Sequence, residues 1–261
     1  MKRKATQKKT SRQETTRARA RPARKRAPVA PKRKVAAKRT SSSKGGPAVA
    51  VTPDLRRRAL RVIDGLKEAY PDARCELDFT NALELLVATI LAAQCTDARV
   101  NLVTPALFRK YRTPQDYVNT PDDVLRDEIR STGFFNNKTK SIKAACRTLV
   151  ERFGGRMPST MEALLQLPGV GRKSANVILV NVYGVPGVVV DTHMLRLSNR
   201  MGFSTSRDAD EVERDMMATF PGSEWIALSH RIAWHGRRCC TARKPNCDEC
   251  PIADDCPKLI D

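Results

Sequence analysis

Four cysteines near the C-terminus restrict this chain more than any other feature. They follow the spacing Cys-x6-Cys-x2-Cys-x5-Cys within 17 residues, at Cys240, Cys247, Cys250 and Cys256. Prolines and acidic turn residues interrupt the segment, so a loop is expected. Four thiolates on one loop can enclose an iron–sulfur cluster or a tetrahedral zinc ion. Zinc ribbons usually separate two Cys pairs more widely, so the spacing favours a cluster over zinc, and either over unligated thiols. Cys239 adjoins the first ligand as a possible substitute.

Positive charge is concentrated at the other end of the chain. Residues 1–50 hold 18 Lys and Arg against one acid, Glu14, and so contribute +17 of the formal +20. With no aromatic residue, residues 1–52 are expected to form a disordered basic arm. Its composition favours a phosphate-binding arm, with a solubilising tail or an organelle transit peptide as the alternatives. No apolar run is long enough for a secretory signal or a membrane span, so an intracellular, non-membrane protein is expected.

From Asp54 onward the apolar spacing is helical almost throughout, and an all-α fold is predicted. The segment 83–93 is apolar nearly all round, as in a central buried helix. Val188–Val190 could be extended, but this run is too short to form a sheet. Further helices are predicted over 98–111, 122–130, 138–153, 160–167, 172–183, 192–201, 209–220 and 224–237.

The segment Leu167–Lys173 (LPGVGRK) separates two of these helices. Gly169 and Gly171 allow a tight turn that brings backbone N–H groups close to an anion, and the following helix N-terminus adds partial positive charge. Such a hairpin can hold one DNA phosphate without reading a base, although PGVG alone could be an ordinary interhelix turn. Arg172 and Lys173 stand where the helix dipole disfavours cations, which strengthens the functional interpretation.

This placement also indicates chemistry for Lys173. The helix N-terminus and the neighbouring Arg172 favour a neutral amine, the form that attacks an electrophilic carbon. Asp191 follows an apolar run and could be a simple helix N-cap, or a carboxylate that stabilises a cationic sugar. Arg243 and Lys244, beside the cysteines, could be a solvated charge run or phosphate contacts. The three histidines show no metal-site spacing and are assigned structural roles.

Five motifs together resemble the endonuclease III family of DNA glycosylases. They are LAAQCTD (91–97), GFFNNK (133–138), LPGVGRK (167–173), VDTH (190–193) and the cysteine loop. The resemblance covers about residues 54–261. It implies a two-lobed helix-hairpin-helix fold, with a six-helix barrel lobe over 75–185 and a cluster lobe from 53–74 and 186–261. It also implies that the cysteine loop holds a structural [4Fe-4S] cluster.

The same resemblance assigns roles to single residues. Lys173 matches the Schiff-base lysine and Asp191 the catalytic aspartate, while Gln94 matches the residue that fills the gap left by a flipped base. Phe134 stands where the family usually has an apolar wedge such as leucine, which leaves the opposite-base preference open. The alternatives for these last two are a helix C-cap for Gln94 and a core aromatic for Phe134.

The predicted activity is bifunctional removal of oxidised pyrimidines and β-elimination at abasic sites, in base excision repair. The expected partner is double-stranded DNA with a damaged base or abasic site, bound by a monomer that is cytoplasmic and nucleoid-associated if the host is bacterial. Two rivals differ in class: a monofunctional mismatch glycosylase of the same fold, which Lys173 argues against, and a non-catalytic DNA-binding protein, which needs neither Asp191 nor four thiolates.

Overall fold

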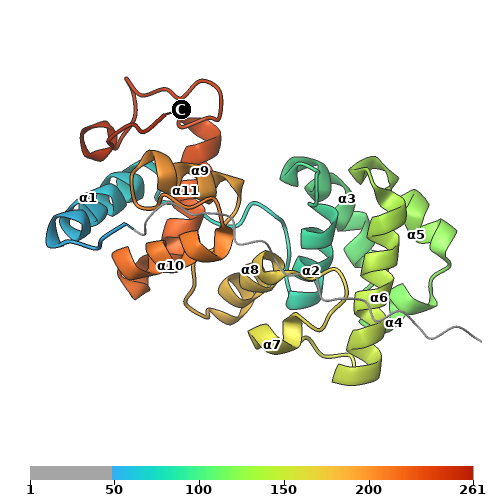
Figure 1. Ribbon diagram of the computed structural model, residues 1–261. Helices are drawn as coiled ribbons and strands as arrows, with labels where there is room; N and C mark the ends of the chain where they lie inside the picture. The colour runs from blue at the N-terminus through green and yellow to red at the C-terminus, as the bar shows by residue number, and fades with distance from the viewer. Residues whose placement is uncertain (1–48, 261) are drawn as a thin grey trace, which may run out of the picture. The chain divides into compact units, whose positions relative to one another are not determined.

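The computed structural model describes residues 49–260, so the predicted arm lies outside the described part except for its last four residues. The described residues form helices and loops without a β-strand, which confirms the all-α prediction (Figure 1). The α-helices are α1 (Pro53–Ala69), α2 (Ala82–Leu91), α3 (Asp97–Lys110), α4 (Pro114–Asn119), α5 (Asp122–Ile129), α6 (Phe135–Phe153), α7 (Met161–Leu164), α8 (Arg172–Tyr183), α9 (Thr192–Arg200), α10 (Ala209–Thr219) and α11 (Trp225–Arg238). Three 3-10 turns are η1 (Arg130–Thr132), η2 (Gly222–Glu224) and η3 (Ala253–Asp255).

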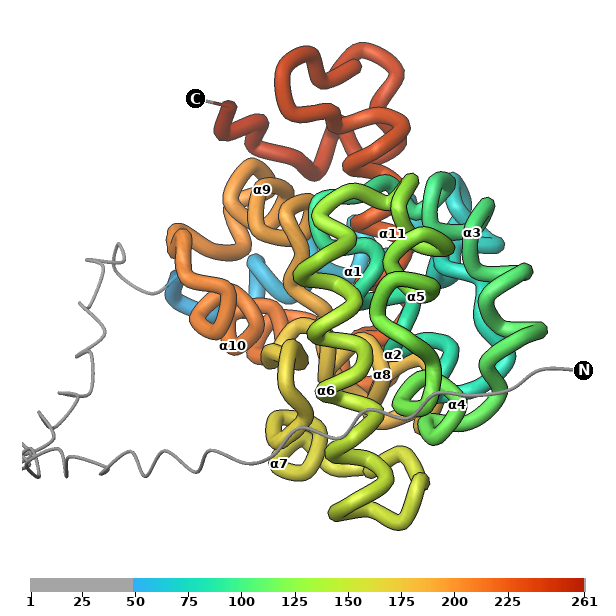
Figure 2. The backbone as a smooth tube through the Cα atoms, turned by 90° about the vertical axis from the view of Figure 1, so that its right-hand side faces the viewer, coloured from blue at the N-terminus to red at the C-terminus, as the bar shows by residue number. Residues whose placement is uncertain are grey.

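The buried apolar side chains form two clusters. The first lies among α2 to α8, and the second joins α1 to α9, α10 and α11. The first helix of the described part therefore packs beside the last ones, as the two views in Figures 1 and 2 show. Two clusters with this membership support the predicted lobes, whose boundaries at residues 75 and 185 stay a prediction.

Helix α2 is the central element of the first cluster. Seven of its ten residues are buried, and it packs against α3, α6 and α8. It begins at Asn81, whose side chain accepts a hydrogen bond from the Glu84 N–H at 3.0 Å, and so satisfies one of the first-turn donors. Its C-terminus at Leu91 leads directly into the turn that carries Gln94. The apolar sequence therefore anchors this turn on a buried helix.

Helix α4 was missed by the sequence analysis, although its start has a local signal. The Thr113 hydroxyl accepts from the Asp116 N–H, and the Asp116 carboxylate accepts from the Thr113 N–H at 2.8 Å. This reciprocal arrangement is a capping box, with Pro114 at the first helical position. The six-residue helix is too short to show apolar periodicity, which explains why the pattern overlooked it.

Two predicted boundaries were wrong beside functional loops. Helix α6 begins at Phe135 instead of Lys138, because the carbonyl of Phe134 already accepts hydrogen bonds from the N–H groups of Asn137 and Lys138. Helix α7 ends at Leu164 instead of Leu167. After it, Gln166 and Leu167 bond to carbonyls three residues back, a tighter turn that leads into the hairpin. None of the helices in residues 49–260 is long and apolar enough to cross a membrane.

Candidate active site and cysteine loop

A cleft of about 290 Å³ lies between helices that contribute to the two apolar clusters. Helices α2 and α8 contribute from one side, while α11 and the segment before α9 contribute from the other. Lys173 and Asp191 both line this cleft, so the structure brings the two predicted catalytic residues to one cavity. Its volume is close to the lower end of the range of about 300–1,000 Å³ that is typical of sites for small ligands.

The Asp191 carboxylate caps α9 through one of its oxygens. Its Oδ1 accepts hydrogen bonds from the N–H groups of His193 at 2.9 Å and Met194 at 2.8 Å, so it caps α9. Both bonds use the same oxygen, and Oδ2 has no hydrogen-bond partner among residues 49–260. The half-buried carboxylate is thus fixed in orientation by one oxygen while the other can face a ligand in the cleft. The N-terminal end of the helix dipole also favours its negative charge.

Lys173 is the second residue of α8, and its neighbour turns away from the cleft. The Arg172 Nε lies 2.9 Å from Glu213 Oε2 and 3.3 Å from Asp210 Oδ1, both on α10. The Asn176 side chain donates to the other Glu213 oxygen at 3.0 Å. Two carboxylates therefore balance the charge of Arg172. These ion pairs also engage the guanidinium that was predicted to contact DNA.

The hairpin before α8 has the geometry expected of a backbone anion site. Gly169 has φ of +83°, and a Cβ built there would approach the Ser141 Cβ to 3.0 Å, so glycine is required by both conformation and space. Gly171 is the N-cap of α8 and provides no side-chain hydrogen bond to the first turn. The first-turn N–H groups of a helix capped in this way can donate to an anion.

Gln94 and Phe134 share an uncommon backbone conformation. Both are exposed and have positive φ, +54° at Gln94 and +48° at Phe134, where side chains other than glycine are strained. Phe134 is 61% exposed, which contradicts the alternative that it is a core aromatic. Helix α2 is capped by Ala92, so the simple C-cap alternative for Gln94 is wrong as well.

Helix α11 adds residues that the sequence analysis did not assign to the cleft. His230 lines it, and burial lowers the pKa of this imidazole, so the ring is uncharged at neutral pH. Arg237 forms ion pairs with Glu76 at 2.5 Å and Asp97 at 2.7 Å, all three at the cleft wall. No sequence motif joins Arg237 to Asp97, which lies 140 residues earlier, so only the fold could show the link.

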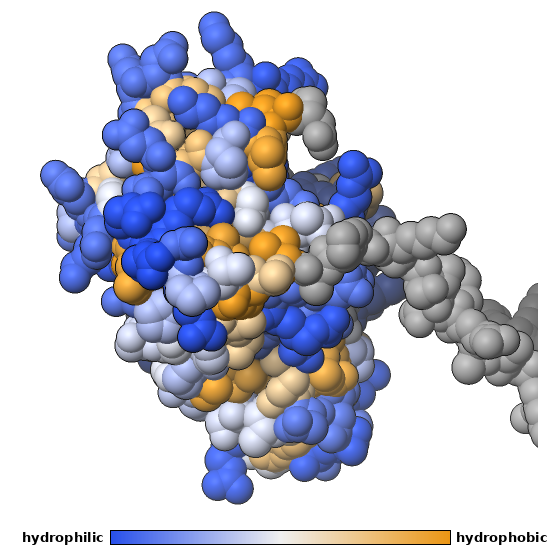
Figure 3. Space-filling view, turned by 60° about the vertical axis from the view of Figure 1, so that its left-hand side comes forward, coloured by the Kyte–Doolittle hydropathy of each residue, from blue (hydrophilic) through white to orange (hydrophobic). Residues whose placement is uncertain are grey.

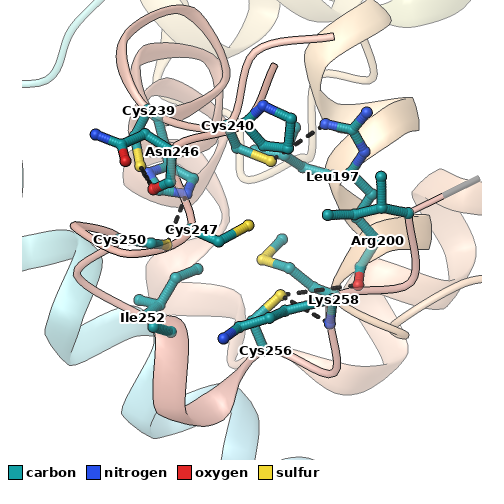
Figure 4. A pocket seen from close by; sticks show the side chains of 15 residues that line it. Leu197, Arg200, Cys239, Cys240, Asn246, Cys247, Cys250, Ile252, Cys256 and Lys258 are labelled. Atoms are coloured by element: carbon teal, nitrogen blue, oxygen red, sulfur yellow. Dashed lines mark hydrogen bonds between the residues drawn. The ribbon is translucent and has the colours of Figure 1, made fainter. Parts of the chain in front are cut away.

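The four predicted ligand cysteines line one small cavity after α11. The sulfur atoms of Cys240, Cys247 and Cys256 point into the same space in Figure 4. Apolar side chains of Leu197, Met201 and Ile252 close the cavity from the protein side. The Cys250 Sγ lies 3.7 Å from His235 Nε2 at the edge of this space. Four thiols lining one mostly apolar cavity fit a four-iron cluster, because thiolate is the usual ligand of such clusters and an apolar surrounding restricts solvent.

Arginines hold the backbone of this cysteine loop. Arg200 donates to the carbonyls of Thr241 and Ala242, each at 2.7 Å, and to Cys240 Sγ at 3.5 Å. Arg196 donates to the Cys240 carbonyl at 2.9 Å and Arg58 to the Asp255 carbonyl at 3.0 Å. Helices α1 and α9 therefore satisfy loop carbonyls that have no regular secondary structure to bond.

Cys239 lines the same cavity as the four predicted ligands, but its sulfur also bonds to the loop backbone. Its Sγ donates to the Asn246 carbonyl at 3.3 Å, and it forms a close group with His235 and Cys250. Burial raises the pKa of Cys239 to about 12. Arg243 and Lys244 are exposed on the same loop, where the Thr241 hydroxyl bonds the Lys244 backbone. Their side chains remain free to meet a polyanion.

Two segments match known protein families. Residues 87–221 match the HhH-GPD superfamily of base excision DNA repair proteins, and residues 240–256 match the iron–sulfur binding domain of endonuclease III. The second match begins at Cys240 and ends at Cys256, which leaves Cys239 outside. Together they define a helix-hairpin-helix base excision repair protein that carries a [4Fe-4S] cluster.

Curated relatives agree over most of the described chain. The endonuclease III of Synechocystis sp. is 49% identical over 77% of this chain and 93% of that protein, and the enzyme of Escherichia coli is 37% identical over 76% and 94%. A trapped endonuclease III–DNA covalent intermediate superimposes with a TM-score of 0.75 at 42% identity, covering 78% of this chain and 96% of that one. The chain belongs to the endonuclease III family, the DNA glycosylases and abasic-site lyases of base excision repair.

A more distant structure shows the fold alone. A thermostable thymine-DNA glycosylase superimposes with a TM-score of 0.69 at 21% identity, covering 77% of this chain and 96% of that one. The helical scaffold therefore serves more than one base specificity, and the choice between them has to come from the cleft.

Proposed function

We propose that this chain binds duplex DNA, removes oxidised pyrimidines and then cleaves the abasic site, with Lys173 as nucleophile and Asp191 as its electrostatic partner. The observation that carries the proposal is that these two residues, from the first turn of α8 and the N-cap of α9, line one cleft. The similar endonuclease III structures solved with DNA support DNA as the partner. Oxidised pyrimidines are the substrate class that the family resemblance implies.

In the first step, a neutral Lys173 amine forms a bond to the sugar C1′ while the glycosidic bond to the base breaks. The Asp191 carboxylate stabilises the positive charge that develops on the sugar. Loss of the amine proton and opening of the sugar ring give a covalent imine. Loss of a C2′ proton then breaks the C3′–O bond and releases the 3′ strand with a 5′-phosphate. Water finally hydrolyses the imine and restores the amine.

DNA contacts are proposed for two groups of residues. The N–H groups around Gly169 and Gly171, with Arg243 and Lys244, would hold backbone phosphates, because they offer donors and positive charge without base specificity. Gln94 and Phe134, exposed on two strained turns, would fill the gap and wedge the stack when a nucleotide is flipped. Arg172 would stabilise the hairpin through Glu213 rather than reach a phosphate itself.

The test is to trap the imine. Borohydride added during turnover on a duplex with one oxidised pyrimidine should reduce it to a stable adduct, and peptide mapping should place the adduct on Lys173. Lys173→Gln should bind the duplex without forming that adduct, whereas Lys67→Gln, an exposed lysine of α1, should behave like the unchanged chain. Base release without any adduct would show a monofunctional glycosylase instead. Binding of the duplex without base release and without an adduct would indicate a non-catalytic DNA-binding protein.

We further propose that the protein acts as a monomer and, in a bacterial host, associates with the nucleoid in the cytoplasm. On the face in Figure 3, hydrophobic side chains lie in small separate groups among hydrophilic ones, unlike a dimer interface. Bacterial relatives such as those above and the net charge of +20 support a location on DNA. Sedimentation of the pure protein and imaging of the tagged chain would test the two statements.

A further inference from the structure

Lys138 is a buried cation between the two turns that carry Gln94 and Phe134. It is 4% exposed, and its Nζ donates to the carbonyl of Leu91 and to the carbonyl of Thr132, each at 2.7 Å. No carboxylate forms an ion pair with it in the described part of the chain. Removing an ammonium group from water costs several kcal/mol even after relaxation, so its position requires an explanation.

The two carbonyls belong to different parts of the sequence. Leu91 ends α2, three residues before Gln94, and Thr132 ends η1, two residues before Phe134. Carbonyls at helix C-termini have no further helical N–H to accept from and carry partial negative charge. The ammonium therefore compensates two helix ends at once. The backbone N–H of Lys138 also donates to the Phe134 carbonyl at 3.1 Å, which links the same residue to the strained turn directly.

We infer that Lys138 is a positioning residue that holds the Gln94 and Phe134 turns in register with each other, so that the two side chains enter the DNA stack together. Positive φ at both residues is sustained only where the surroundings oppose relaxation. A charge-assisted hydrogen bond to each turn supplies that restraint. Lys138 contacts neither the cleft nor a substrate, so it acts through the two exposed residues. This inference rests on the wedge and gap-filling roles proposed above.

Its consequence is confined to one step of the reaction. A loose pair of turns should raise the barrier to flipping a base that is well stacked and paired. A lesion that lies opposite a gap in the other strand is already unpaired and partly unstacked. The two turns then contribute less to flipping it. The chemistry at Lys173 should then proceed at nearly the normal rate. A role in general folding would affect both substrates equally.

The experiment compares Lys138→Met, which keeps the aliphatic stem but has no donor, with Lys67→Met as the charge-matched control on exposed α1. Single-turnover excision by the full chain is measured on a paired lesion and on the same lesion opposite a gap. Lys138→Met should lose about tenfold or more on the paired lesion, the size expected for one charge-assisted hydrogen bond, and much less opposite the gap. Lys67→Met should excise both lesions at the rate of the unchanged chain.

A double-mutant cycle with Phe134→Ala tests whether Lys138 acts through the wedge. The excision rate of the double variant should be only slightly lower than that of Phe134→Ala alone. Once the Phe134 ring is removed, the restraint by Lys138 no longer positions a wedge. Hydrogen exchange should also rise in 92–97 and 133–137 of Lys138→Met but not in α9. If Lys138→Met does not fold, Lys138→Gln, which keeps an amide NH2 group as a donor but has no charge, replaces it.

Equal losses on the two substrates, additive effects in the cycle, or unchanged exchange in both turns would overturn the inference. Failure of the proposed function is distinguishable, because the unchanged chain would then excise no lesion and form no Lys173 adduct. If the unchanged chain is active and Lys138→Met matches Lys67→Met, only the positioning role is wrong.

Discussion

The Arg237 guanidinium on α11 lies 2.7 Å from the Asp97 carboxylate at the start of α3. This ion pair joins an element of the second apolar cluster to one of the first, across the wall of the cleft. The second Arg237 nitrogen pairs with Glu76. Arg237 also lies three residues before Cys240, so the cysteine loop and the cleft share one helix end. The ion pairs therefore link helices of the two clusters at the wall of the cleft.

Arg237→Met should loosen this link and leave two partly buried carboxylates without a counter-charge. The free energy of unfolding should fall by about 1 kcal/mol, because the groups are partly exposed and screened. Urea unfolding followed by circular dichroism checks this value. Asp97→Asn combined with Arg237→Met should be less destabilising than the sum of the single changes. Additive effects would show that the pair contributes nothing to holding the clusters together.

Cys247→Ser should remove iron and destabilise the loop. Cys247 lines the cavity beside the other three thiols, and a three-thiolate site binds a four-iron cluster less firmly. The unchanged chain should hold about four irons and absorb broadly near ~400 nm, as thiolate-ligated clusters do. Iron analysis and the visible spectrum of protein purified without oxygen check the loss. Cys239→Ser should keep its iron, because the family match begins at Cys240.

Stoichiometric zinc without iron in the unchanged chain would contradict the cluster. If Cys239→Ser loses as much iron as Cys247→Ser, the first ligand is Cys239 and not Cys240. The two variants differ only in which thiol of the loop is removed, so they separate the adjacent cysteines more sharply than removal of the whole loop would.

Local sequence signals predicted the elements that depend on local chemistry. The start and end of α8 follow from Gly171 and Gly184 on either side of an apolar run, and α9 from the capping Asp191. The fold class, the family and the cluster were confirmed. The cysteine spacing alone predicted a metal-binding loop with a cluster favoured over zinc, and the five-motif resemblance supplied the family and the [4Fe-4S] assignment.

Contacts between distant segments could not be predicted in the same way. Arg172 pairs with Glu213, 41 residues away, and nothing in the LPGVGRK motif indicates that partner. Nothing in the GFFNNK motif indicates that the Lys138 amine reaches Leu91, 47 residues earlier. Both side chains are flexible, and their partners are fixed only when the helices pack. The roles assigned to Lys173, Asp191 and the DNA contacts stay predictions that the cleft supports.

Removal of residues 1–50 should weaken binding to undamaged duplex and flatten its dependence on salt. That segment has a net charge of +17, and a chain that neutralises fewer phosphates displaces fewer counterions from the DNA. Thr52, which caps α1, remains in the shortened chain, so the described fold should be preserved. Binding titrations across a range of salt concentrations give the slope. Single-turnover excision on bound substrate should barely change, and an unchanged salt slope would show that the segment does not touch DNA.

Asp191→Asn separates the two roles of this side chain. Its amide oxygen can still accept hydrogen bonds from the His193 and Met194 N–H groups, so the N-cap of α9 and the fold should be retained. What is lost is the negative charge that would face the developing sugar cation, which should slow base removal by about 100-fold or more, the size seen when one electrostatic stabiliser is removed. Cleavage of a preformed abasic site should slow less, because no glycosidic bond has to break there.

Asp191→Ala removes both the cap and the charge, so it should lose about 1 kcal/mol of stability in addition. Rapid-quench kinetics on the two substrates, with thermal unfolding of both variants, measure these effects. Asp191→Asn excising at the normal rate, with Asp191→Ala merely less stable, would reduce this residue to a helix cap and leave Lys173 without its electrostatic partner.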